Sequence, residues 1–326
     1  MTHAFGPPII CHPDTGFVLV AGDDAIDFLQ SIVTANVATL EIGACRPSAL
    51  LTPQGRILID MMIYRPHATQ FILRTDAARR DDLYTRLRRY RLRRPVDLGI
   101  LEDMKLAIHM PGDLPNETPN EMISAAVMIF TDPRDSNLGQ HILFRADQDL
   151  TALAMPDTSN DQPPSEADAE IDFTGAYIDN WHARRIAGGI PEGAIDLTPE
   201  RALMLEAGLD TLGAVDFEKG CYVGQEVTAR THYRGLVKRR LVPIIIDGAA
   251  PATDSDITWN DTIIGTSKTA ANIPNAQNTP NGSICLALLK LSDIHAINDN
   301  AGQLLAGGNA GTLALPAWMQ PLPKAK

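Results

Sequence analysis

The sequence feature that most constrains this chain is a cysteine bracketed by two glycines, Cys221 between Gly220 and Gly224. Glycine reaches φ > 0 without steric cost, so we expect the backbone to turn sharply here or to approach a ligand closely. Lys219 would favour the thiolate, as would the amino end of a short helix expected from Gly224 to about Tyr233. The alternative is a glycine-rich turn around a half-buried, inert thiol.

The residues around this cysteine resemble the signature of a known family. Residues 219–226 read Lys-Gly-Cys-Tyr-Val-Gly-Gln-Glu and continue as Val-Thr-Ala-Arg. This run resembles the signature of the YgfZ-type folate-binding proteins, which include a mitochondrial iron–sulfur assembly factor. That family is itself similar to the T-protein of the glycine cleavage system, a tetrahydrofolate-dependent aminomethyltransferase. The stretch from Gly22 to Tyr64 resembles the amino-terminal region of the same family, which widens the match.

The resemblance implies the fold class. We expect an α+β, aminomethyltransferase-like fold, with two α+β units around a central cleft followed by a carboxy-terminal β-barrel. An amino-terminal folate-binding unit would cover residues 1–100, a second unit with the signature residues 101–236, and the barrel residues 237–326. Short apolar runs separated by turn residues also predict a small barrel in the last part of the chain.

Apolar periodicity and turn residues predict the individual elements. Asp76 is expected to cap a helix, and residues 147–170, acidic and rich in proline and serine, are expected to form a long loop. Besides the helix after Cys221, the expected helices cover residues 25–33, 76–92 and 173–187. The expected strands cover residues 17–20, 48–51, 56–64, 71–73, 104–110, 123–130, 141–144, 238–246, 262–267 and 282–289.

The resemblance also implies site residues. Cys221 would be the functional thiol, and Lys219 the catalytic residue that keeps it reactive. Asp60 stands where T-proteins carry an Asp-Asp pair implicated in folate chemistry; an aspartate satisfied by a turn is the alternative. Ala187 stands where T-proteins have a glutamate that grips the pterin, which argues against their mode of binding. The residues implied for binding folate are Asp60, Gly220, Tyr222, Gly224, Gln225, Glu226 and Arg230, and no metal site is implied.

These residues favour a folate-binding accessory factor for iron–sulfur cluster assembly or repair, with an effect on iron–sulfur-dependent tRNA modification. Its partners would be iron–sulfur assembly or cluster-containing proteins, and its cofactor tetrahydrofolate or a related reduced folate. Such a factor would be non-catalytic or weakly catalytic. The alternative is a tetrahydrofolate-dependent aminomethyltransferase in which Asp60 orients the folate.

The net charge, the cysteine spacing and the start of the chain narrow the expected ligands and cellular compartment. A formal net charge of −12 argues against sequence-independent nucleic-acid binding. The four cysteines are far apart and lack a Cys-x-x-Cys pair, which fits neither a disulfide framework nor a zinc site and suits a reducing compartment. No signal peptide, transit peptide or membrane-spanning run is recognisable, so we expect a cytoplasmic protein that does not enter a membrane.

Eight arginines lie between residues 79 and 94. Such a run on a helix is usually a solvated face. In an acidic protein it also concentrates positive charge, which could attract a folate polyglutamate tail, RNA or an acidic partner. The sequence leaves these alternatives open.

Overall fold

The computed structural model describes residues 9–110, 127–148, 150, 171–172, 178–274 and 280–323. Its contacts divide the chain into two compact units, each of which is described by itself. Unit 1 comprises residues 1–26, 40–46 and 62–181; unit 2 comprises residues 27–39, 47–61 and 182–326. The predicted three-part division at residues 100 and 236 stays a prediction.

The first five-stranded sheet has the order β10-β1-β7-β9-β8. β1 pairs with β10 in parallel, whereas the other neighbours are antiparallel. Alternating apolar side chains from β1, β7 and β9 form its core, among them Ile9, Ala107 and Ile142. The strands are β1 (Ile9–His12), β7 (Met104–His109), β8 (Val127–Thr131), β9 (Gln140–Arg145) and β10 (Ile171–Asp172).

The second five-stranded sheet has the order β3-β4-β5-β2-β6. It contains the predicted hairpin, whose turn is closed by a hydrogen bond from Thr52 N to Arg56 O of 2.8 Å. Gly55 in this turn has φ 73°, which explains the glycine. The sheet comprises β2 (Thr15–Ala21), β3 (Cys45–Leu51), β4 (Ile57–His67), β5 (Gln70–Asp76) and β6 (Asp97–Ile100), and α1 (Ala25–Gln30) follows β2.

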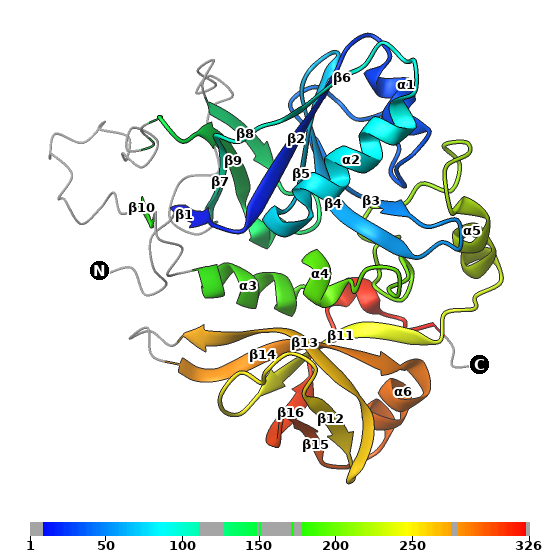
Figure 1. The fold of residues 1–326 in the computed structure, drawn as a ribbon. Helices are drawn as coiled ribbons and strands as arrows, with labels where there is room; N and C mark the ends of the chain where they lie inside the picture. The colour runs from blue at the N-terminus through cyan, green and yellow to red at the C-terminus, as the bar shows by residue number, and fades with distance from the viewer. Residues whose placement is uncertain are drawn as a thin grey trace, which may run out of the picture. The chain divides into compact units, whose positions relative to one another are not determined.

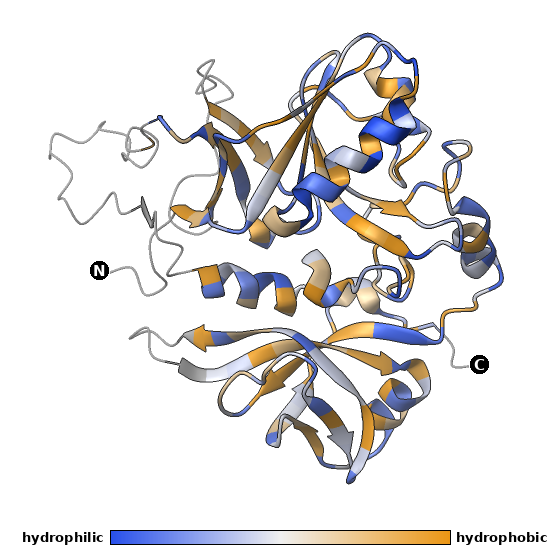
Figure 2. Ribbon diagram, in the orientation of Figure 1, coloured by the Kyte–Doolittle hydropathy of each residue, from blue (hydrophilic) through white to orange (hydrophobic). Residues whose placement is uncertain are grey.

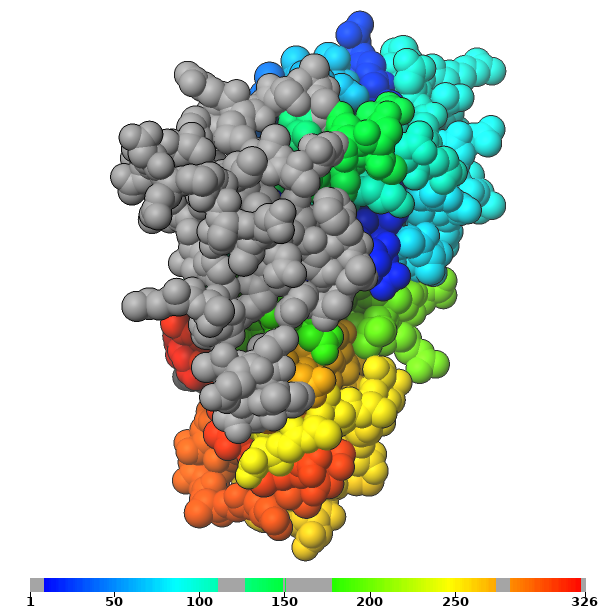
Figure 3. All heavy atoms as spheres, turned by 90° about the vertical axis from the view of Figure 1, so that its left-hand side faces the viewer, coloured from blue at the N-terminus to red at the C-terminus, as the bar shows by residue number. Residues whose placement is uncertain are grey.

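The arginine-rich helix α2 (Arg80–Arg91) packs along β2, β5 and β6 through the buried Leu83 and Leu87 (Figure 1). Its ribbon is mostly hydrophilic (Figure 2), and residues of the same part of the chain lie at the surface (Figure 3). Asp76 precedes the 3-10 turn η1 (Ala77–Arg79) and makes no side-chain capping bond there, contrary to the prediction. The cap is lost because the 3-10 turn delays the α-helix, whose N-cap is Arg79.

Several of these arginines are paired with carboxylates within unit 1. The pairs are Arg79 and Arg86 with Asp82, Arg80 with Asp81 and Glu102, and Arg94 with Asp24. The pairs are partly exposed, so each stabilises the fold by at most about 1 kcal/mol. This is the arrangement of a solvated helix face.

Unit 2 contains a closed barrel of order β11-β14-β13-β12-β15-β16. The barrel confirms the expected fold class. The sequence did not predict α6 (Leu291–Asp299), which buries Leu291 and Ile294 after the long strand β14. The barrel strands are β11 (Arg239–Ile246), β12 (Asp256–Trp259), β13 (Thr262–Pro274), β14 (Pro280–Lys290), β15 (Leu304–Ala306) and β16 (Asn309–Leu313).

The remaining helices are α3 (Ile178–Ala187), α4 (Gly193–Asp196) and α5 (Gln225–Tyr233), with 3-10 turns at Ser136–Leu138 and Ala317–Met319. α5 has the predicted bounds. The first residues of the expected helix 173–187, nearly all of the expected loop 147–170 and residues 123–126 of an expected strand lie outside the described residues.

Candidate functional site

The loop around Cys221 has the backbone conformation expected from its glycines. Gly220 has φ 97° and Gly224 has φ 83°, both in the region that favours glycine. A Cβ on Gly224 would lie 2.5 Å from Thr52 O and 2.9 Å from Leu51 Cβ, whereas one on Gly220 would meet nothing within 4 Å. Gly224 therefore allows the amino end of α5 to approach the β3–β4 turn. Gly220 has no such contact and only allows the chain to turn.

Cys221 differs from the other three cysteines in exposure. Its side chain is exposed and forms no disulfide, Cys11 is half-buried, and Cys45 and Cys285 are buried. Burial raises the pKa of the Cys45 and Cys285 thiols to about 12, which keeps them protonated. Of the four thiols in the chain, Cys221 is the one offered to solvent.

Lys219 fixes the loop through two backbone carbonyls. Its Nζ donates to Val33 O at 2.6 Å and to Ala35 O at 2.5 Å, and lies 5.2 Å from the centre of the Tyr222 ring. Burial lowers the pKa of Lys219 to about 7, against the opposing charge of Asp216. Its donors are thus directed at the segment after α1, and its predicted effect on the Cys221 thiol stays a prediction.

Asp216 and Gln30 add hydrogen bonds between the Cys221 loop and the region of α1 and the segment after it. Asp216 Oδ2 accepts from Asn36 Nδ2 at 2.9 Å, and Asp216 Oδ1 accepts from Glu218 N at 2.7 Å. Burial acts to raise the pKa of Asp216, but these hydrogen bonds outweigh it and the pKa is lowered. Gln30 Nε2 donates to Lys219 O at 3.3 Å. The roles of Gln30, Asn36 and Asp216 could not be predicted from the sequence, because the bonded partners are far apart along the chain.

We call the hydrogen bonds of Lys219, Asp216 and Gln30 that connect the Cys221 loop to α1 and the segment after it the clamp. The other predicted residues of the signature lie next to the clamp in the sequence. Tyr222 is buried, and burial raises the pKa of its hydroxyl to about 12. Gln225 is half-buried at the start of α5, and Glu226 and Arg230 are exposed along it. The loop and α5 therefore form one continuous structure that carries all the predicted residues except Asp60.

Asp60 lies on β4, and its Oδ2 accepts from Gly193 N, at the start of α4, at 2.9 Å. Gly55, which contacts Gly224, lies in the turn five residues before Asp60.

Asp196, on the helix α4 whose first residue bonds to Asp60, is also engaged. It accepts from Arg185 Nη1 at 2.7 Å, from Glu192 N at 3.0 Å and from Thr269 N at 2.9 Å. Ala187, at the end of α3, supplies no acceptor for a pterin. These residues do not fit the carboxylate grip on a pterin that the T-protein resemblance implies.

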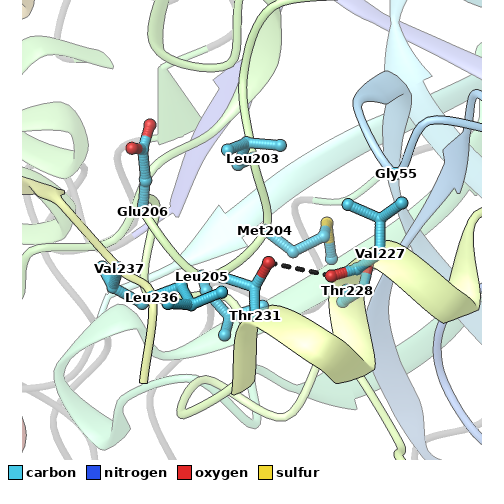
Figure 4. Close-up of a pocket in the computed structure, with 10 residues that line it drawn as sticks. All are labelled: Gly55, Leu203, Met204, Leu205, Glu206, Val227, Thr228, Thr231, Leu236 and Val237. Carbon is cyan, nitrogen blue, oxygen red and sulfur yellow. Dashed lines mark hydrogen bonds between the residues drawn. The ribbon is translucent and has the colours of Figure 1, made fainter. Parts of the chain in front are cut away.

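A pocket lies beside α5 in unit 2 (Figure 4). Thr228 Oγ1 donates back to Gly224 O at 3.1 Å, and Thr231 Oγ1 donates to Val227 O at 2.8 Å. Because both hydroxyls are used by the helix backbone, these threonines add little polarity to the pocket wall. The lining residues are Gly55, Leu203, Met204, Leu205, Glu206, Val227, Thr228, Thr231, Leu236 and Val237.

Within the part of the chain that the structure describes, no group of three His, Cys, Asp or Glu side chains is arranged to hold a metal ion. Among the same residues, no helix is long and apolar enough to cross a membrane.

Comparisons with known proteins agree with this architecture. Residues 14–112 match the family model of the GCVT N-terminal domain, and residues 238–321 match that of the CAF17 C-terminal β-barrel domain. The crystal structure of the glycine cleavage system aminomethyltransferase T from Bartonella henselae superposes with a TM-score of 0.70. It covers 99% of this chain and 89% of its own at 16% sequence identity, so it shows the aminomethyltransferase-like fold alone.

Three relatives share the name of one iron–sulfur cluster assembly factor. Iron-sulfur cluster assembly factor IBA57, mitochondrial, from Mus musculus is 31% identical over 92% of this chain and 82% of its own length. The protein of the same name from Homo sapiens is 30% identical over 83% and 74%. The homolog from Neurospora crassa is 32% identical over 73% of this chain, which spans about half of that longer relative (54%).

These names correct one expectation. The sequence predicted a cytoplasmic protein, but the relatives are named as mitochondrial proteins, so that prediction is wrong. The absence of a recognisable leader was too weak a signal to assign a compartment. The identity and coverage shared with the mouse and human proteins establish that this chain belongs to the family of the iron–sulfur cluster assembly factor IBA57.

Proposed function

We propose that this protein is an iron–sulfur cluster assembly factor that presents Cys221 as one ligand of a cluster shared with a partner protein. The observation that carries the proposal is the exposure of this thiol on a loop held by Lys219. The names of the mouse and human relatives support the cluster as cargo.

The ligand count explains why the cluster is shared. A [2Fe–2S] or [4Fe–4S] cluster takes four protein ligands, usually cysteine thiolates. Cys45 and Cys285 are buried and Cys11 is half-buried in β1, so these three do not join Cys221 at the surface. The remaining ligands therefore come from the partner, an assembly protein or a cluster-containing protein.

The clamp holds the Cys221 thiol in a fixed position. Two hydrogen bonds from Lys219 and one from Gln30 connect the loop to the segment after α1, and the α5 backbone begins at Gly224. A ligand that is already ordered loses less conformational entropy when it binds.

The test uses a [2Fe–2S] cluster complexed by glutathione, whose thiols stand in for those of the partner. Added anaerobically to the purified protein, it should give a visible circular dichroism signal as the cluster enters a protein environment. Cys221→Ser should lose this signal, whereas Cys285→Ala, which changes a buried thiol, should keep it.

Two outcomes would contradict the proposal. One is an equal signal from Cys221→Ser. The other is a stoichiometric cluster that survives chromatography on the isolated chain without glutathione, since the chain would then supply all the ligands itself.

Binding of a reduced folate is a finer proposal, supported by the match of residues 14–112 to the GCVT N-terminal domain. Asp60, which was predicted to bind it, accepts a hydrogen bond from Gly193 N, and no step of the function is derived through folate. Titration calorimetry with tetrahydrofolate should show saturable binding that weakens in Asp60→Ala; no heat at millimolar ligand would refute it. An effect on tRNA modification would follow indirectly from cluster supply, and no structural observation favours the aminomethyltransferase alternative.

A further inference from the structure

We propose that the carboxy-terminal end of α5 is a docking surface for an acidic protein segment that inserts an aliphatic side chain into the adjacent pocket. We call this surface the α5 patch and define it by Arg230, Tyr233, Leu236 and Lys238, all of them exposed. The proposal rests on the proposed function, because it describes how the partner that shares the cluster is held.

The pocket calls for an apolar occupant. The hydroxyls of Thr228 and Thr231 are bound to the α5 backbone. The single lining carboxylate, Glu206, pairs with Arg239 at 3.3 Å and points away from α5 (Figure 4). The remaining wall is largely leucine, valine and methionine, so an aliphatic side chain would fill it without leaving a polar group unpaired.

Exposed apolar and aromatic side chains lie at and just beyond the carboxy-terminal end of α5, and one of them, Leu236, lines the pocket. Tyr233 is 70% exposed and Leu236 is 41% exposed. Beside them, the ring of Phe217 stacks on His232 at 3.9 Å between centroids, and Tyr233 meets His232 edge-on at 5.1 Å. Exposed aromatic and aliphatic side chains gathered at a pocket are typical of protein–protein contacts.

The charge of this region is opposite to that of the whole protein. Residues 230–240 contain five lysines and arginines and no acid, although the net charge of the chain is −12. Arg240 is buried, where its Nη1 donates to Leu205 O at 3.1 Å, and Arg239 pairs with Glu206. Arg230, Arg234 and Lys238 are exposed at the surface, and Asp210 lies 3.8 Å from His232. An acidic segment is the complement of this charge.

The position of the patch agrees with the proposed function. α5 begins four residues after Cys221, and its nine residues span about 13 Å. A small partner domain bound at the carboxy-terminal end of α5 could therefore also reach the exposed Cys221 thiol. Nucleic acid would satisfy the basic charge but has no aliphatic side chain for the pocket, which is why we assign a protein.

The probe is a fluorescently labelled acidic peptide with one leucine among aspartates and glutamates, measured by anisotropy. The protein should bind it, and binding should weaken as salt rises from about 0.05 to 0.5 M. Leu236→Asp should weaken binding by about 10-fold or more, and Lys238→Glu by several-fold. Ile263→Asp, which changes a 61% exposed residue on β13, is the matched control and should bind like the wild type.

Three results would overturn the proposal. The first is equal binding of a peptide whose leucine is replaced by serine. The second is a Leu236→Asp protein that melts like the wild type and binds like it. The third is a stronger affinity for a single-stranded RNA of matched charge than for the peptide.

The peptide assay is independent of the cluster assay. Cys221→Ser should bind the peptide like the wild type, because this thiol does not belong to the α5 patch. Failure of the peptide to bind a protein that accepts the glutathione-complexed cluster would reject the docking surface and leave the proposed function standing. Peptide binding by a protein that gives no cluster signal would do the reverse.

Discussion

Two regions take charged groups out of water: the Cys221 loop in unit 2 and a polar cluster in unit 1. We call the second one the buried network, and it consists of Tyr64, Asp132, Arg134 and His141. Asp132 Oδ2 lies 2.7 Å from Arg134 Nη2 and 3.1 Å from His141 Nε2, and Tyr64 Oη lies 2.8 Å from His141 Nδ1. Asp132 and His141 are at most 2% exposed.

The buried network is complete within itself. Burial lowers the pKa of His141, so its ring is neutral. Burial acts to raise the pKa of Asp132, but Arg134 and His141 outweigh it and hold that pKa below its usual range. A neutral ring beside a carboxylate carries its proton on Nε2, so Nδ1 accepts from the Tyr64 hydroxyl. Each of the four side chains contacts another member of the network, although His141 Nε2, 3.1 Å from Asp132 Oδ2, is not aligned for a hydrogen bond.

The Cys221 loop has the opposite arrangement. Its cation, Lys219, is largely buried and engaged with carbonyls, while the thiol two positions later is exposed. The comparison teaches that a strongly shifted pKa does not by itself identify a functional site. The buried network holds β4 and β9 together, whereas the buried contacts of the loop hold one exposed thiol in place.

Removing the charge at the centre of the buried network should have the largest effect. Asp132→Asn leaves Arg134 buried without its counter-charge, which should lower the free energy of unfolding by about 3–5 kcal/mol. Chemical denaturation followed by circular dichroism measures this. Asp135→Asn, at a half-buried residue that accepts a hydrogen bond from Asn137 N, should cost about 1 kcal/mol or less. Similar losses in the two variants would show that the buried network does not hold the unit together.

The two glycines of the loop should separate close approach from backbone strain. In Gly224→Ala the new Cβ would strike Thr52 O and Leu51, so we expect a loss of about 2–3 kcal/mol. In Gly220→Ala the Cβ meets open space and only the positive φ opposes it, at a cost of about 1 kcal/mol. Thermal melts of the two proteins test the order, and the reverse order would contradict the contacts assigned to Gly224.

The clamp predicts a dependence of stability on pH. The pKa of Lys219 is about 7 in the fold and 10.5 as an ordinary lysine, so the unfolded chain binds more protons between these values. Stability that depends on this residue should therefore rise as the pH increases from 7 to 10.5. Because solvent screening of this half-buried group reduces the effect to about 1 kcal/mol, the wild-type melting temperature should gain about 2–4 °C over Lys219→Met across this window. A constant difference between the two proteins would show that Lys219 stays charged throughout.

The smallest effect on stability should come from the thiol itself. Cys221→Ser changes an exposed side chain, so the free energy of unfolding should change by no more than about 0.5 kcal/mol. Its loss of the cluster signal would then be a chemical effect. A large destabilisation would instead show that the thiol is part of the core, and would remove the contrast with the buried network.

The sequence by itself determined the features that depend on neighbouring residues. The positive φ of Gly220 and Gly224 follows from the absence of a Cβ, and the bounds of α5 were predicted from the residues that follow Gly224. The β3–β4 hairpin was visible as two apolar runs around a turn. The family signature supplied the fold class and the barrel.

Only the tertiary structure decided which distant groups meet. Lys219 was expected to act on the neighbouring sulfur, but its donors reach Val33 and Ala35, more than 180 positions earlier. Asp60 hydrogen-bonds to Gly193, 133 positions later, and Asp132 joins a network that reaches back to Tyr64. A polar side chain shows its chemistry in the sequence but not its partner. The partner is set where backbone groups left unpaired by sheets and helices become buried and must find a donor or acceptor.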